Sequence, residues 1–190
     1  MKQHSMIIDD FLDNPQHTRD QLLIQPMMDY KASDNVTYPG IIELPESVQT
    51  EVKYKLNYLF QGRLSDKITM FARYSMADMA PPHWAHSDYE MAEFTGLIYM
   101  NPKHPPDDGT YLVRHKIEQF EEHPVNDHQV KVLLDDSNQK HLWLKTFHCP
   151  ARFNRLFIAN ARQLHAAGPS YGTRKETSRL VITVFFHLNS

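Results

Sequence analysis

The sequence predicts a mainly β protein, an antiparallel sandwich or jelly roll supported by N-terminal α-helices. Helical patterns are confined to about residues 1–65, and beyond Asp66 short apolar, β-branched and aromatic runs alternate with clusters of Pro, Gly, Asn and Asp. No strand–helix–strand rhythm appears, which argues against a parallel doubly wound sheet. We therefore expect a single domain over residues 1–190, with helical support over about 1–65 and a jelly-roll core over about 66–188.

Two helices are expected in the N-terminal part. The first follows Asn14, a typical cap residue, has Pro15 in its first turn and runs through Ile24. The second begins near Pro45 and ends near Gly62. Its apolar residues recur at helical spacing and share one face: Val48, Val52, Leu56, Leu59 and Phe60.

The rest of the chain predicts strands joined by turns. The candidate strands are Ile68–Tyr74, Phe94–Met100, Thr110–Arg114, Gln129–Leu134, Leu142–Phe147, Arg155–Ala159 and Arg179–Leu188. The polar stretch from about Lys116 to Lys140 is longer than a simple hairpin needs, and we expect it to form a flap over a substrate.

Composition narrows the class of protein. Hydrophobic residues make up 41% and charged residues 23%, which is typical of a globular chain and not of a disordered one. The net charge of −3 disfavours nucleic acid as a partner, and the single Cys149 leaves no internal disulfide. No apolar run approaches the ~20 residues of a membrane span, and no signal-peptide pattern opens the chain. We expect a cytoplasmic protein without a membrane partner.

Three side chains have the spacing of a metal site. On an extended strand His86 and Asp88 point to the same side, so both can reach one ion. This spacing alone is a weak signal, because a solvated pair in a polar loop looks the same. His165 follows another apolar run and could supply a third ligand, or be an ordinary core histidine. Two imidazoles and one carboxylate leave metal positions open, as in non-heme Fe(II) oxygenases.

A buried cation is expected at the start of the last strand. Alternation along the last strand puts Arg179, Val181 and Thr183 on one face. An Arg on a mostly apolar strand is costly to bury without an anion, and a carboxylate matches its planar fork. Arg174 could take the same role, but we prefer Arg179 because the uninterrupted strand pattern begins there.

An ordered series of short segments resembles the Fe(II)- and 2-oxoglutarate-dependent dioxygenase superfamily, particularly its prolyl-hydroxylase-like branch. The similarity covers about residues 66–188. The segments are Phe71-Ala72-Arg73-Tyr74, His86-Ser87-Asp88, Leu97-Ile98-Tyr99-Met100-Asn101, Gly109-Thr110-Tyr111-Leu112, Asn154-Arg155-Leu156-Phe157-Ile158, His165 and Arg179. The resemblance implies a double-stranded β-helix, the form of jelly roll found in that superfamily.

The resemblance also implies an activity and a cofactor set. It implies an Fe(II)-binding catalytic centre, a 2-oxoglutarate site, and O2-dependent hydroxylation of a small-molecule or peptide substrate with release of succinate and CO2. The metal ligands would be His86, Asp88 and His165. The residues near the co-substrate would be Arg179 at its distal carboxylate, with Tyr74, Tyr99 and Thr183.

Two other functions fit the same residues. A cupin-like metal-dependent enzyme would keep the three metal ligands and use no ketoacid. A jelly-roll binding module would bind a small molecule or peptide without turnover. The sequence names no substrate and leaves the oligomeric state open, and a dimer is compatible with it.

Overall fold

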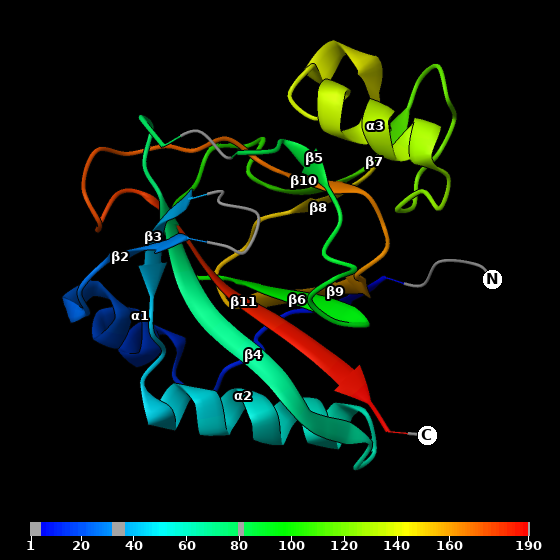
Figure 1. Cartoon of the computed structure of the whole chain (residues 1–190). Coiled ribbons are helices and arrows are strands. Elements are labelled where there is room, and N and C mark those ends of the chain that lie inside the picture. The colour runs from blue at the N-terminus through cyan, green and yellow to red at the C-terminus, as the bar shows by residue number, and fades with distance from the viewer. Residues whose placement is uncertain (1–4, 32–36, 80–81, 190) are drawn as a thin grey trace.

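Two antiparallel sheets lie face to face in the computed structural model, which describes residues 5–31, 37–79 and 82–189 (Figure 1). Within these residues the large sheet has the strand order β1-β9-β6-β11-β4-β3-β2 and the small sheet the order β5-β10-β7-β8. The strands of the large sheet are β1 (Met6–Ile8), β2 (Met28–Lys31), β3 (Thr37–Ile42), β4 (Leu64–Ser75), β6 (Phe94–Tyr99), β9 (Arg155–Asn160) and β11 (Arg179–Leu188). The strands of the small sheet are β5 (Ala85–His86), β7 (Gly109–His115), β8 (Trp143–Pro150) and β10 (His165–Ala167). The predicted jelly-roll class is confirmed.

Two helices support the large sheet from outside. They are α1 (Pro15–Ile24) and α2 (Glu46–Leu59), both close to the ranges that the sequence predicts. Figure 1 shows them beyond the outer face of the large sheet, where α2 buries Val48, Val52 and Leu56 in the largest hydrophobic cluster. The N-terminal part also supplies β1, β2 and β3, which the sequence analysis did not anticipate.

Alternation along β11 separates two cores. Leu180, Ile182 and Val184 belong to the cluster shared with the helices. Val181 belongs to a second cluster between the sheets, together with Tyr99 and Leu112. Since successive strand residues point to opposite faces, Arg179 and Thr183 share the interior face with Val181. The sheet thus presents an apolar face to the helices and a partly polar face to the interior.

The predicted strand Gln129–Leu134 is wrong, because this segment lies in the helix α3 (Asp127–Asp136). Asn126 caps it: the Asn126 side chain accepts a hydrogen bond from the Gln129 N–H at 2.9 Å and donates one to the Gln129 side chain at 2.8 Å. The bond from the Gln129 N–H to the Asn126 side chain is an N-cap, which favours a helix over the strand that Val130 and Val132 suggest.

Helix α3 lies on the outside of the small sheet. Its buried Leu133 packs with Trp84 and Trp143, and the short 3-10 helix η1 (Lys140–Leu142) follows it. A buried His115 ring nitrogen lies 3.2 Å from the carboxylate of Asp136 and ties the end of the helix to β7. This part of the expected flap is therefore placed away from the interior between the sheets. No helix in the described part of the chain is long and apolar enough to cross a bilayer.

Asn154 links the N-terminal segment to the start of β9 in the large sheet. It has a φ of 63°, a left-handed conformation that Asn tolerates better than most residues. Its side chain accepts a hydrogen bond from the Leu12 N–H at 2.7 Å and donates one to the Leu12 carbonyl at 2.9 Å. Both residues are buried, so these bonds satisfy backbone groups that water does not reach.

Replacing this residue tests its role in stability. We expect Asn154→Ala to lower the free energy of unfolding by about 2–4 kcal/mol, because two buried Leu12 backbone groups lose their partner and Ala is strained at this φ. Urea denaturation followed by circular dichroism measures the change. The exposed Asn57→Ala is the matched control, and an equal loss in both variants would contradict the assignment.

Candidate metal centre

Two histidines meet on the interior face of the small sheet. His165 of β10 lies directly opposite His86 of β5, and Leu112 of β7 lies on its other side. The two imidazole rings are 4.4 Å apart between centroids. The pairing of two very short strands thus brings together residues that are far apart in the sequence.

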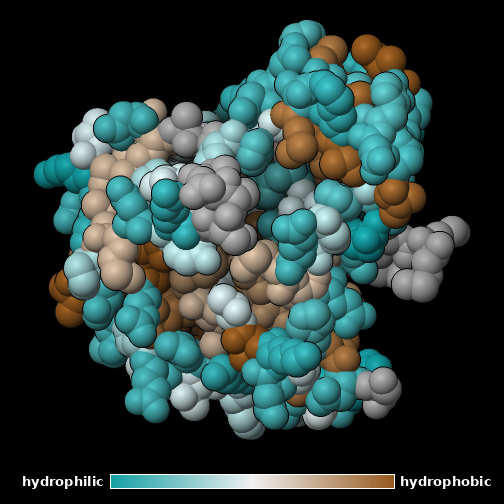
Figure 2. Space-filling view, viewed as in Figure 1, coloured by the Kyte–Doolittle hydropathy of each residue, from teal (hydrophilic) through white to brown (hydrophobic). Residues whose placement is uncertain are grey.

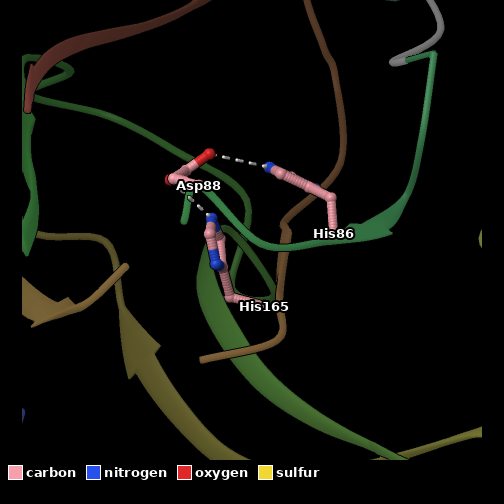
Figure 3. Close-up of side chains that lie close together, drawn as sticks. All are labelled: His86, Asp88 and His165. Atoms are coloured by element: carbon pink, nitrogen blue, oxygen red, sulfur yellow. Dashed lines mark ion pairs between the residues drawn. The ribbon is translucent and has the colours of Figure 1, made fainter. Parts of the chain in front are cut away.

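Asp88 completes the group. Its N–H donates to the Ala161 carbonyl at 2.9 Å, and its Oδ2 accepts a hydrogen bond from the Thr95 hydroxyl at 2.9 Å. Its Oδ2 lies 3.3 Å from His165 Nε2, and its Oδ1 lies 3.9 Å from His86 Nε2. Figure 3 shows the three side chains pointing toward one another, and all three candidate ligand atoms lie within 4.8 Å of each other.

The other nitrogen of each imidazole faces a backbone carbonyl. His165 Nδ1 lies 3.0 Å from the Gln163 oxygen, and His86 Nδ1 lies 3.3 Å from the Trp84 oxygen. A ring N–H that donates to such a carbonyl leaves the Nε2 lone pair free. This second contact is the usual way in which proteins orient a metal-binding histidine.

The charges of the group suit a divalent cation. Burial and the neighbouring His165 lower the pKa of His86 to about 4, so this ring is neutral at pH 7. Burial opposes ionisation of Asp88, but the two imidazoles and the Thr95 hydroxyl outweigh it and hold the pKa at about 2. Burial likewise opposes protonation of His165, but Asp88 outweighs it and raises the pKa of this imidazole. Metal binding requires an ionised acid and neutral imidazoles, so His86 and Asp88 already have the required charge states and a bound ion would displace a proton from His165.

The donor set fits a metal with open positions. The candidate ligand atoms are two nitrogens and one oxygen, and the His86 side chain is 37% exposed, against 14% for Asp88 and 10% for His165. Figure 2 shows a hollowed, largely hydrophobic area between the two sheets with hydrophilic residues around it. Two imidazoles and one carboxylate are the ligand set of non-heme Fe(II) oxygenases.

Arg179 is buried between the sheets and already has an acidic neighbour. Its Nε donates to Asp108 Oδ1 at 2.7 Å, and a terminal nitrogen donates to the Gly109 carbonyl at 3.1 Å. Asp108 also accepts hydrogen bonds from the Tyr171 hydroxyl at 2.9 Å and from the Gly109 N–H at 2.7 Å. Arg174, the alternative, is exposed in the loop before β11. Asp108 is not among the residues predicted from the sequence, because the pattern around it indicates only a turn.

The two predicted tyrosines lie on opposite faces of the large sheet. Tyr99 faces the interior and donates to the Thr110 hydroxyl at 2.8 Å, and Thr183 lies on the same face. Tyr74 is instead buried among the helices, where burial raises its pKa to about 12. Its expected interior position is therefore wrong, because it pairs with outward-facing Leu180. Its hydroxyl has no hydrogen-bond partner among the described residues.

The fold is shared with solved oxygenase structures of low sequence identity. The non-heme alpha-ketoglutarate-dependent carbocyclase SnoK from nogalamycin biosynthesis matches with a TM-score of 0.60 and 13% identity over 98% of this chain and 80% of its own. HygX from Streptomyces hygroscopicus, with nickel and 2-oxoglutarate bound, matches with a TM-score of 0.57 and 10% identity over 96% and 81%. A prolyl hydroxylase from Trichoplax adhaerens, in complex with a hypoxia inducible factor peptide, gives 0.52 and 12% over 96% and 82%.

A sequence-family model covers nearly the whole chain. The family of unknown function DUF6445 matches residues 1–186, and the chain belongs to this family. No curated protein matches the sequence. The similar solved structures therefore inform the fold, and the local geometry informs the chemistry.

Removing a ligand tests the metal centre. We expect His165→Ala and Asp88→Ala to weaken Ni(II) binding by more than about 100-fold, because even residues behind the ligands commonly contribute ~10–100-fold. Isothermal titration calorimetry on the metal-free protein measures the affinity, with one ion per chain expected for the unaltered protein. The exposed His104→Ala is the matched control. Unchanged binding in either ligand variant would rule the site out.

Proposed function

We propose that this member of the DUF6445 family is an Fe(II)- and 2-oxoglutarate-dependent oxygenase that hydroxylates a small molecule or peptide. The metal ligands in this proposal are His86, Asp88 and His165. The observation that supports it most is the convergence of their three ligand atoms within 4.8 Å on the interior face of a jelly roll. The ordered resemblance to the prolyl-hydroxylase-like branch agrees with this proposal, and the substrate itself stays open.

The ketoacid would extend from the metal along the interior face. Arg179 is the cation for its distal carboxylate, because it is buried on that face while Arg174 is exposed. Tyr99 and Thr110 form a hydroxyl pair nearby, and Thr183 lies between the Arg179 end of β11 and the metal end. The phenol of Tyr99 donates to Thr110, so the Thr110 hydroxyl proton is free to donate to a ligand.

In this proposal the protein orients the metal ligands and limits the access of water to the site. Bound iron, 2-oxoglutarate and O2 would supply the oxidising power, with succinate and CO2 as co-products. The carbonyls behind His86 and His165 orient the imidazoles, and the Thr95 hydroxyl orients the carboxylate of Asp88. Apolar side chains between the sheets, among them Leu97 and Phe157, limit the access of water.

One observation favours a second candidate function. Because Asp108 already pairs with Arg179, the interior has an internal carboxylate where the ketoacid is expected. A metal-dependent jelly-roll enzyme without a ketoacid would have the same three ligands and no need for a free cation. A module that binds no metal and turns nothing over would be the third outcome.

Ketoacid binding at the metal separates these functions. We expect Fe(II) and 2-oxoglutarate to give a weak visible charge-transfer band under anaerobic conditions, because the ketoacid chelates the iron. We also expect the protein to form succinate slowly in air. The band should vanish in His86→Ala and persist in the exposed His128→Ala. Metal binding without the band would favour the ketoacid-independent enzyme, and no metal binding would favour the binding module.

The two candidate arginines can be told apart. We expect Arg179→Gln to weaken 2-oxoglutarate binding by about 10–100-fold, since a hydrogen bond to a charged group contributes ~1.5–3 kcal/mol. It should also reduce stability, because Asp108 loses its buried partner. Arg174→Gln should change neither property, because its side chain is exposed. Titration of the anaerobic band and thermal unfolding measure the two effects. The reverse order of effects would assign the role to Arg174.

A further inference from the structure

A second arginine faces the interior beside Arg179. Arg73 lies on β4 directly opposite Val181 of β11, so it shares the interior face with Val181 and is a diagonal neighbour of Arg179. Its Nε donates to the Pro39 carbonyl at 3.3 Å, and its guanidinium carbon lies 5.8 Å from the centroid of the Tyr38 ring. It is only partly exposed, and the described residues form no ion pair with it.

The charges at this end of the interior do not cancel. Arg179 is neutralised by Asp108 at 2.7 Å, whereas Arg73 adds a second guanidinium that forms an ion pair with no acid among the described residues. Burial, and then repulsion from Arg179, lower the pKa of Arg73. A largely buried cation without a counter-ion is unfavourable unless a ligand supplies the negative charge. Two guanidinium groups and one carboxylate leave one positive charge, which matches one further carboxylate.

The position of Arg73 indicates which carboxylate this is. Arg73, Val181 and Tyr99 form one row across β4, β11 and β6. Thr95, which holds the metal-side carboxylate, lies opposite Phe185, farther along the same strands. A ketoacid that bound the metal and reached Arg179 would extend from the Thr95 end of these strands toward the row of Arg73.

We propose that Arg73 is a second carboxylate-binding residue, which receives the distal carboxylate of 2-oxoglutarate together with Arg179. This inference rests on the proposed function. Asp108 then has a defined part: it orients Arg179 and reduces the charge of the pair of arginines to one, so that a single carboxylate neutralises it. A pocket of this kind prefers a ketoacid with a second carboxylate over one without it.

Arg73 can be replaced more safely than Arg179. Arg73→Gln removes a cation that forms no ion pair with the described residues, so no acid among them is left unpaired, and we expect only the small loss of stability that follows from losing the hydrogen bond to the Pro39 carbonyl. Circular dichroism and thermal unfolding establish this before any binding is measured. Arg73→Lys keeps the charge but loses the planar fork, and it serves as the second variant should the Gln variant be poorly folded.

The test compares two ketoacids that chelate iron alike. 2-Oxoglutarate has a distal carboxylate and pyruvate has none, so the ratio of their dissociation constants reports the distal carboxylate alone. Each is titrated anaerobically into the Fe(II) protein and followed by its charge-transfer band. We expect Arg73→Gln to weaken 2-oxoglutarate by about 10–100-fold and to leave pyruvate unchanged, with Arg73→Lys in between. The exposed Arg63→Gln is the matched control.

Each outcome decides the inference. A lost preference for 2-oxoglutarate in Arg73→Gln supports it. An unchanged preference overturns it and leaves Arg179 as the only cation of the proposed site. Equal weakening of both ketoacids also overturns it, because Arg73 would then act on the metal end. An unaltered protein that binds Fe(II) without either ketoacid overturns the proposed function itself, and the inference with it.

Discussion

The candidate metal centre depends on one register, the pairing of β5 with β10 that sets His165 opposite His86. A slip by one residue would turn one imidazole to the outer face of the small sheet. Small side chains hold the register from that face, where Ala85 and Ala166 pack against Trp84. The Asp88 N–H bond to Ala161 then fixes the carboxylate. Strand pairing thus places the two histidines, and a backbone hydrogen bond places Asp88.

Much of the fold could be predicted from the sequence because its patterns are local. The two N-terminal helices follow from their start signals and apolar spacing, and β11 follows from alternation over Arg179–Leu188. The segment Gln129–Leu134 failed because Val130 and Val132 alternate as in a strand, while the deciding signal was the cap at Asn126. The short strands β5 and β10 exist only through their partners, which local patterns do not contain.

Site residues could be predicted where residue type and sequence spacing both indicate a metal ligand. They could not be predicted where the strand register determines which side chain faces the interior. His86, Asp88 and His165 could be chosen as candidates from residue type and order, and the structure brings them together. Which of Arg73 and Tyr74 faces the interior is set by the pairing of β4 with β11, which no pattern in either strand specifies. Asp108 could not be predicted as a site residue for a similar reason, because its partner Arg179 comes from the opposite sheet.

The shortness of β5 and β10 has a consequence for dynamics. These strands have two and three residues, while the β4–β11 ladder extends from Ser75–Arg179 to Leu64–Leu188. Regions with few backbone hydrogen bonds open locally at a lower free energy than the whole domain unfolds. The ligand-bearing edge can therefore exchange its amide protons through sub-global opening while the helix-backed sheet stays closed. A bound cation would suppress that opening by linking the two short strands. Metal binding would therefore slow the exchange of the backbone amide protons at this edge.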